Sequence, residues 1–250
     1  MTVSRPARIW GLIAGQAASR GGRVSAADAC AAAVAAVAVT GAWLSTGAGP
    51  ETSHLISVTD EVCGLLAELQ LTLGEGPSQD ALDAGGPALA SDLGEAGTAR
   101  RWPVFAPAAR QAGAAAIFAF PLQIGAIRPG VMSLYRDRQG PLSPFQLGDA
   151  LVLADAATLL LLEAQDPVGG PVPESGPGGQ FPDLGRCRAE IDQATGMLTE
   201  QLGVGITEAF AWLRAYAYAH DMRLNDLARE IVSRRLRADP NPDPDLRGHM

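Results

Sequence analysis

A run of glycine and proline at residues 166–179, DPVGGPVPESGPGG, constrains this chain more than any other feature. Five of its residues are glycine and four are proline. Proline lacks a backbone donor and glycine loses much conformational freedom on ordering, so such a run does not lie inside a helix or strand. The sequence therefore predicts two folding units. The predicted division is residues 1–165, a linker at 166–182, a second unit at 183–239 and a tail at 240–250.

Charge is distributed unevenly along the 250 residues. The formal net charge of −8 argues against non-specific nucleic-acid binding, because such binding depends on neutralising phosphates. Residues 1–179 carry 10 Arg against 16 acidic residues, whereas residues 180–239 carry 8 Arg against 9. All 19 basic residues are Arg, a bias that a GC-rich genome would produce without any functional cause. The second unit is nevertheless Arg-dense, and Arg can pair with phosphates and base edges.

The three cysteines, Cys30, Cys63 and Cys187, are far apart and form no CxxC or Cys/His cluster. This favours reduced thiols in a cytoplasmic protein, with no metal site and no cofactor. The first residues contain no long apolar stretch followed by a cleavage site, so we expect no secretion signal. The apolar run 151–162 is too short to span a bilayer and contains Asp155, so we expect no membrane segment.

The first unit has the pattern of an α+β domain. Residues 25–40 are an alanine-rich helix with Ser25 as its cap, and short apolar segments separated by turn residues indicate strands. The predicted helices are 25–40, 61–73, 78–83, 105–112 and 144–164, and the predicted strands are 42–46, 54–59, 88–92, 114–122 and 130–137. This order favours a sheet flanked by helices.

The second unit shows three helical patterns, at 184–202, 207–219 and 224–237. Thr207 is the expected cap of the second helix, and Pro240 prevents continuation of the third. The apolar stripes consist of Ile191, Ala194, Met197, Leu198 and Leu202 in the first helix, Ala209, Phe210, Leu213 and Ala217 in the second, and Leu224, Leu227, Ala228, Ile231 and Val232 in the third. Helices this short must share one core, because none would be stable alone.

These helices resemble an ANTAR domain across most of residues 184–236. The matching residues are Arg188, Ile191, Gln193, Ala194, Gly196 and Leu198 in the first helix, followed by Ala209, Phe210, Leu213, Arg214, Ala217, Arg223, Leu224 and Ala228. The resemblance implies a regulator, usually dimeric, that binds RNA carrying two small hairpins and prevents a terminator from forming. The family usually has Lys between the Ala and Gly of the first-helix motif, where this chain has Thr195, so a phosphate contact made there would be lost.

The resemblance and the side-chain chemistry together predict an RNA-binding set of Arg188, Gln193, Ala194, Gly196, Arg214 and Arg223. Hairpin loops present splayed bases, which amides and guanidinium groups can bind by hydrogen bonds. Glycine inside a helix lowers the stability of the helix by about 1 kcal/mol relative to alanine, so the presence of Gly196 calls for an explanation. Ala194 and Gly196 would let an RNA loop approach the backbone, or would equally permit close packing of two helices.

The aromatic residues of the second helix leave two interpretations open. Trp212 and Tyr216 lie one turn apart and Tyr218 is offset, so the three cannot share one core stripe. We interpret Trp212 and Tyr216 as interface residues, with base stacking the less favoured use. His220 has no nearby metal partner in the sequence and is not expected to be a ligand.

Most of residues 25–163 resemble a GAF domain of the actinobacterial GAF–ANTAR type, over the stretches 73–82, 101–122 and 130–157. The resemblance implies a sensor domain with a pocket over its sheet and an unidentified small ligand. Cys63 and His54 lie near the expected pocket, but we expect both to be packing residues. No nucleophile–base pair or phosphate-binding loop indicates an enzyme.

The leading hypothesis is therefore a cytoplasmic, RNA-binding antitermination regulator that forms a homodimer. Helices 144–164 and 184–202 are the candidates for dimer contacts, although the linker interrupts the continuous coiled coil found in many relatives. One rival is a small-molecule or redox sensor whose C-terminal helices bind a protein partner. A second rival, a catalytic GAF domain, is disfavoured because no reactive group of residues is seen.

Overall fold

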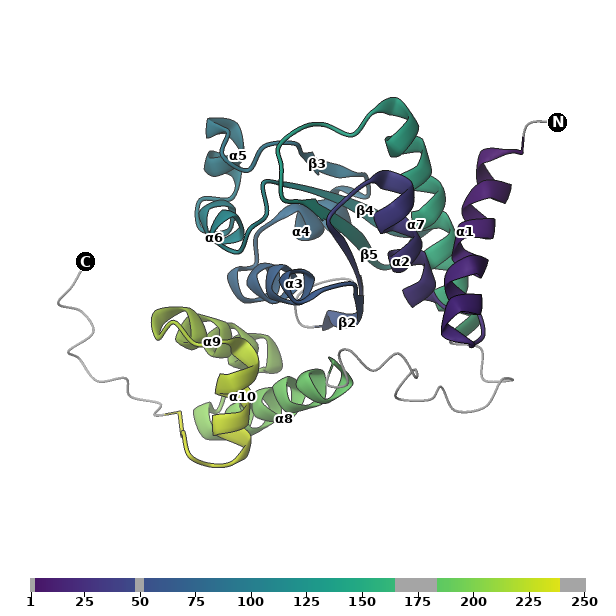
Figure 1. The fold of residues 1–250 in the computed structure, drawn as a ribbon. Helices are drawn as coiled ribbons and strands as arrows, with labels where there is room; N and C mark the ends of the chain where they lie inside the picture. Colours follow the sequence, from purple (N-terminus) through teal and green to yellow (C-terminus); the bar gives the residue numbers. More distant parts are fainter. Residues whose placement is uncertain (1–2, 48–51, 165–183, 239–250) are drawn as a thin grey trace. The chain divides into compact units, whose positions relative to one another are not determined.

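The computed structural model describes residues 3–47, 52–164 and 184–238, with the backbone alone for residues 184–187. The chain divides into two compact units, residues 1–185 and residues 186–250 (Figure 1). The predicted linker at 166–182 and the predicted tail at 240–250 lie outside the described residues.

The first unit is built on a five-stranded antiparallel sheet with the strand order β2-β1-β5-β4-β3. Its strands are β1 (Gly41–Thr46), β2 (His54–Val58), β3 (Ala88–Ala90), β4 (Ala116–Ile124) and β5 (Ile127–Arg136). All five lie where the sequence predicts strands, although β3 is shorter than the predicted 88–92 and β5 begins three residues before the predicted 130.

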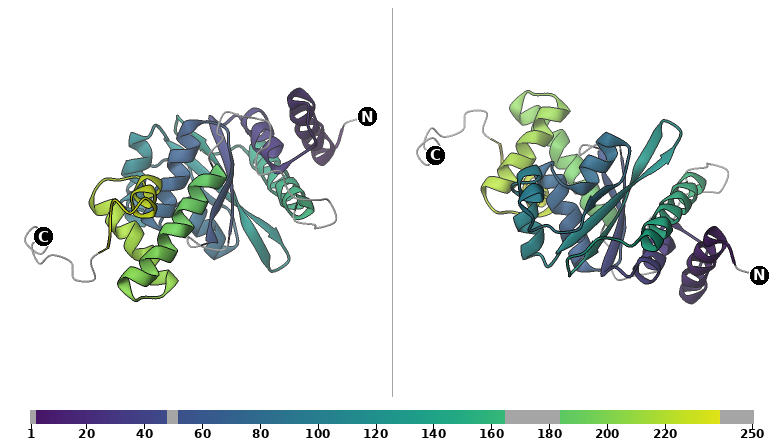
Figure 2. Two further views of the ribbon diagram at one scale, coloured as in Figure 1. Left: turned by 90° about the horizontal axis from the view of Figure 1, so that it is seen from below. Right: turned by 90° about the horizontal axis from the view of Figure 1, so that it is seen from above.

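Helices cover both faces of this sheet (Figure 2). One face carries α2 (Ala26–Val37) and α7 (Pro144–Ala164), with α1 (Arg5–Arg20) packed against both, and the other carries α3 (Glu61–Leu73), α4 (Pro77–Ala84), α5 (Ala96–Arg101) and α6 (Phe105–Gln111). Alternate residues of a strand point to opposite faces, so each strand serves both cores. Phe118 and Phe120 of β4 join the core beneath α2 and α7, whereas Ile117 joins the core on the opposite face.

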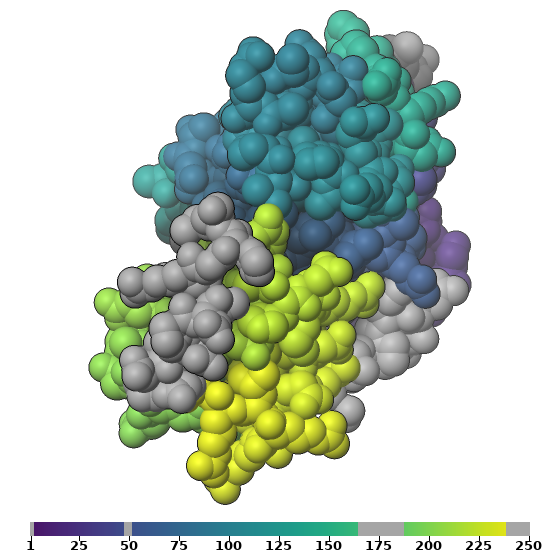
Figure 3. All heavy atoms as spheres, turned by 90° about the vertical axis from the view of Figure 1, so that its left-hand side faces the viewer, coloured from purple at the N-terminus to yellow at the C-terminus, as the bar shows by residue number. Residues whose placement is uncertain are grey.

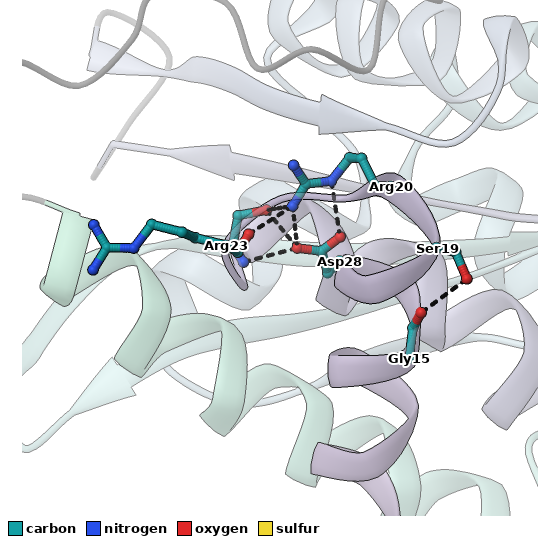
Figure 4. A network of polar contacts seen from close by, with 6 residues as sticks. Gly15, Ser19, Arg20, Arg23 and Asp28 are labelled. Carbon is teal, nitrogen blue, oxygen red and sulfur yellow. Dashed lines mark hydrogen bonds and ion pairs between the residues drawn. The ribbon is translucent and has the colours of Figure 1, made fainter.

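Helix α1 occupies residues for which the sequence predicted no element. Ser4 caps it by accepting a hydrogen bond from the Ala7 amide at 3.4 Å, and it buries only the stripe Ile9, Ile13 and Ala17. Ion pairs hold both of its ends. Arg5 and Arg8 pair with the fully buried Asp149 of α7 at one end. At the other end Arg20 reaches Asp28 of α2 at 2.7 Å, as Figure 4 shows.

Helix α7 is long and apolar enough to cross a membrane by length and composition alone. Half of its most apolar window is buried inside the first unit, against α1, α2 and the sheet. It therefore packs as the core helix of a folded domain does, although the whole helix is longer than the apolar run 151–162 considered from the sequence.

The second unit consists of α8 (Leu184–Leu202), α9 (Ile206–Ala219) and α10 (Leu224–Val232), so the predicted three-helix architecture is confirmed. Two boundaries differ from the prediction. Gly205 caps α9 in place of Thr207, and its amide donates to the Glu208 carboxylate at 2.7 Å. The third helix ends at Val232, five residues before the predicted 237, because Arg234 adopts a left-handed conformation with a φ of 59°.

Candidate nucleic-acid interface

Helix α8 separates its predicted RNA-binding residues onto different faces. Gln193 and Gly196 are exposed, and a Cβ added at Gly196 would meet no atom of the described residues within 4 Å. The glycine is therefore not explained by close packing of another helix within the described part of the chain. An open mid-helix glycine beside an exposed amide leaves the backbone accessible to a ligand.

Ala194 has no exposed surface and belongs to the core with Ile191 and Leu198. Its methyl group therefore packs inside the helical unit and is not accessible at the surface, so the structure favours the packing interpretation of Ala194. Thr195, which stands where the family has Lys, is 4% exposed, and its hydroxyl donates to the Ile191 carbonyl at 2.8 Å. Position 195 therefore presents no polar group at the surface.

The three predicted arginines differ in their surroundings. The Arg188 side chain is 11% exposed and forms an ion pair with Asp192, one turn along α8, at 2.7 Å. The Arg214 guanidinium lies 6.0 Å from the centre of the Phe210 ring, and burial lowers the pKa of this arginine. Arg223 is exposed at the start of α10. Of the three, Arg223 is the most accessible to a phosphate.

Several other charged residues of this unit form ion pairs within it. Arg229 of α10 contacts Glu190 of α8 at 2.9 Å and Asp226 at 3.4 Å, and Arg235 contacts Glu230 at 3.3 Å. The exposed face of α8 that carries Gln193 and Gly196 also carries the acidic residues Asp192 and Glu200. This face of α8 is therefore polar and acidic and does not form a basic surface.

The structure brings together three rings that the sequence analysis did not group. Trp212 and Tyr216 stack with their centres 4.9 Å apart, and Tyr216 and His220 stack with centres 3.9 Å apart. We call this stack of Trp212, Tyr216 and His220 the ring column. The four-residue spacing was visible in the sequence, but His220 was considered there only as a metal ligand. In the space-filling view of Figure 3 the atoms of α9 and α10, yellow-green to yellow, form part of the surface of the helical unit.

The two cysteines of the first unit are poorly reactive. Cys30 and Cys63 are fully buried, and burial raises the pKa of each thiol to about 12. Cys63 is in the first turn of α3, with its sulfur 3.6 Å from the Thr59 hydroxyl. A buried protonated thiol is a poor nucleophile, which argues against a redox sensor that works through either residue. As predicted, Cys63 is a packing residue, whereas His54 of β2 is exposed.

Residues 186–232 match the sequence model of the ANTAR domain family. The helices of the second unit therefore form an ANTAR domain, as the resemblance predicted. ANTAR domains are found in RNA-binding regulators of transcription termination, so this domain points to a regulator. No match to a curated protein is found.

Several solved structures are similar to part of this chain. The GAF domain of a phosphoenolpyruvate-protein phosphotransferase from Coxiella burnetii is 10% identical with a TM-score of 0.46, covering 64% of this chain and 96% of that one. The corresponding domain from Acinetobacter is 12% identical with a TM-score of 0.45, covering 66% and 96%. A free methionine-R-sulfoxide reductase from Thermoplasma acidophilum is 14% identical with a TM-score of 0.40, covering 55% and 89%.

Proposed function

We propose that the chain is a GAF–ANTAR antitermination regulator whose helical unit binds paired hairpin loops in nascent RNA. The observation that carries this proposal is the exposed, open Gly196 beside Gln193 on α8 of an ANTAR domain. Glycine is unfavourable inside a helix, and within the described residues it is not needed for packing. Close approach of an RNA backbone or base to α8 would explain why glycine occupies position 196.

The proposed RNA contacts are assigned to the side chains that are exposed. Gln193 offers an amide that can bind a base edge, and Arg223 offers an exposed guanidinium for a phosphate. Arg188, which pairs with Asp192, and Arg214, which lies over the Phe210 ring, are less accessible and would make peripheral RNA contacts. Sequence-specific contacts of this kind are compatible with a net charge of −8, because they do not depend on bulk positive charge.

The substitution Gly196→Ala tests this proposal. The added methyl group meets open space, so α8 should become more stable by about 1 kcal/mol, whereas RNA affinity should fall because the backbone is covered. Electrophoretic mobility shift with a dual-hairpin RNA measures the affinity, and thermal unfolding measures the stability. Gly196→Leu should enlarge the loss of binding with the fold retained by circular dichroism.

Two controls complete the experiment. RNA with scrambled loop sequences should bind weakly, and equal binding would exclude readout of the loops. Full RNA affinity in both Gly196 variants would remove the α8 face from the interface.

We also propose that the chain is a cytoplasmic homodimer, which matches a target with two hairpins. Helix α7 supports this, because its outer side exposes Leu151, Leu159 and Leu162 by 43%, 48% and 38%. Exposed leucines in a row on one helix are typical of a helix–helix interface. Sedimentation equilibrium of Leu159→Glu should show monomers if α7 forms the interface, whereas an unchanged dimer would assign the contact elsewhere.

A further inference from the structure

The ring column runs along one side of α9, next to the buried stripe formed by Leu213 and Ala217. Trp212 and Tyr216 are half-buried, and His220 at the end of the column is exposed. The planes of Tyr216 and His220 differ by only 13°, so the rings are nearly parallel. The His220 ring is further oriented by its Nδ1 atom, which lies 2.9 Å from the Tyr216 carbonyl oxygen.

The column ends at His220 because the helix does. The chain turns at Asp221, which has a φ of 51°, and the amide of Met222 donates to the Ala217 carbonyl at 2.9 Å. The next residue at the same spacing, Leu224, is fully buried in the core and adds no ring. His220 is therefore the outermost of three stacked rings, held in place before any ligand arrives.

The charge near this end of α9 suits a nucleic acid better than the outer face of α8 does. Between Ala209 and Ala219 the only charged residue of α9 is Arg214. Arg223, exposed, follows His220 by three residues, and Asp221 is the one acid between them. The exposed face of α8, in contrast, carries Asp192 and Glu200. An aromatic ring beside an exposed arginine matches a base with its phosphate.

We propose that the exposed end of the ring column, at His220, stacks against one unpaired base of the bound RNA, with Arg223 pairing with an adjacent phosphate. This inference rests on the proposed function, because it requires an RNA target. Hairpin loops supply such bases, since their nucleotides can be splayed out and stacked on aromatic rings. Stacking tolerates any base, so the ring column contributes affinity and the polar contacts contribute specificity.

The test uses the full-length chain and a dual-hairpin RNA with 2-aminopurine at single loop positions, because this base loses fluorescence when it stacks. The wild-type chain should quench the probe at one loop position. His220→Ala should abolish the quenching and weaken binding by about 5- to 150-fold, the range measured for loss of one base–aromatic stack. His220→Phe, which keeps a ring, should retain both.

Two further variants serve as controls. Tyr218→Ala removes a ring that is 59% exposed but lies outside the ring column, so affinity and quenching should stay at the wild-type level. His220→Gln keeps a polar group at the same position without a ring, and should behave like His220→Ala. Thermal unfolding of each variant shows whether the fold is retained.

The outcomes separate this inference from the proposed function. If the wild-type chain binds no hairpin RNA, the proposed function fails. If the wild-type chain binds and the Ala and Gln variants bind and quench equally well, the stacking site is overturned while the proposed function stands. A loss of stability in these variants without a loss of RNA affinity would assign the ring column to helix stabilisation and would also overturn the proposal.

Discussion

The two units of this protein place their charged residues in opposite ways. In the first unit, acidic groups are buried beneath α1: Asp149 has no exposed surface and Asp28 is 3% exposed, and both pair with arginines of α1. In the ANTAR domain the ion pairs lie at the surface, as Arg229 with Glu190 shows. Charge thus attaches a helix in the first unit, whereas in the second unit most of the described arginines, Arg223 and Arg229 among them, are exposed.

The hydrophobic cores of the two units also differ. The sheet has a core on each face, built from alternate residues of its strands, whereas the ANTAR domain has one small core to which each helix contributes a single stripe. A small core constrains fewer side chains, so a larger share of each helix remains at the surface for recognition. The first unit thus uses buried polar groups to attach a helix, whereas the ANTAR domain leaves polar and aromatic groups at its surface.

Core truncations should give the largest effects and show whether the units unfold independently. Phe118 is buried in the sheet core and Leu213 in the helical core. Phe118→Ala should destabilise the first unit by about 3–5 kcal/mol, and Leu213→Ala should destabilise the second by about 2–5 kcal/mol, because each leaves a cavity. In calorimetry of the full chain each substitution should shift one transition only. A common shift of both transitions would show that the units fold as one.

Asp149→Ala should have an intermediate effect on the first unit. The substitution removes the buried carboxylate that Arg5 and Arg8 share, but these arginines are 41% and 35% exposed and can be hydrated. We expect a loss of about 1–3 kcal/mol in the free energy of unfolding, together with faster amide exchange in α1. Glu163→Ala, at an exposed position near the end of the same helix, is the control and should change stability by less than about 0.5 kcal/mol. Equal effects would show that the Asp149 pairs do not hold α1.

The other end of α1 should respond to acid. Burial alone would raise the pKa of Asp28, but hydrogen bonds from Arg20 and Ser25 and the charge of Arg20 lower it below the ordinary value of 3.8. A lowered pKa means that the folded state binds fewer protons, so this contribution is present above pH 3.8 and is lost as the pH falls through the depressed pKa. Asp28→Asn should cost about 1 kcal/mol at neutral pH and should flatten the acid limb of the stability profile. An unchanged acid limb would assign the pH dependence to other carboxyl groups.

Much of the fold follows from periodicity in the sequence. The strands β1, β2, β4 and β5 and the helices α2, α3 and α7 to α9 lie where alternation or helical stripes predict them. Helix α1 was missed because its buried stripe has only three residues, and much of its attachment depends on Asp149, which lies more than a hundred residues away. The end of α10 was missed because an arginine rarely adopts the left-handed conformation that Arg234 has.

The candidate site shows where two sources of inference conflict. Periodicity assigned Ala194 to the core stripe, because it lies three residues after Ile191 and four before Leu198, whereas the family resemblance assigned it to the RNA contacts. The structure agrees with periodicity. Gly196 is out of phase with that stripe, and its exposure follows from the same rule. The ring column required three dimensions, because ring orientation is not encoded in residue spacing.

The smallest expected effects concern how helices end in the two units. Glycine ends α1 in a left-handed conformation, but Ala38 after α2 and Arg234 after α10 adopt that conformation with φ values of 53° and 59°. Ala38→Gly should therefore stabilise the first unit by about 0.5–1 kcal/mol, because the strain of the Cβ is relieved. Ala35→Gly, at an exposed position inside the same helix, should destabilise by about 1 kcal/mol. Chemical denaturation measures the free energy of unfolding of both variants, and the two changes should have opposite signs. If Ala38→Gly also destabilises the first unit, the left-handed end of α2 is not strained. Arg234→Gly should stabilise the ANTAR domain in the same way.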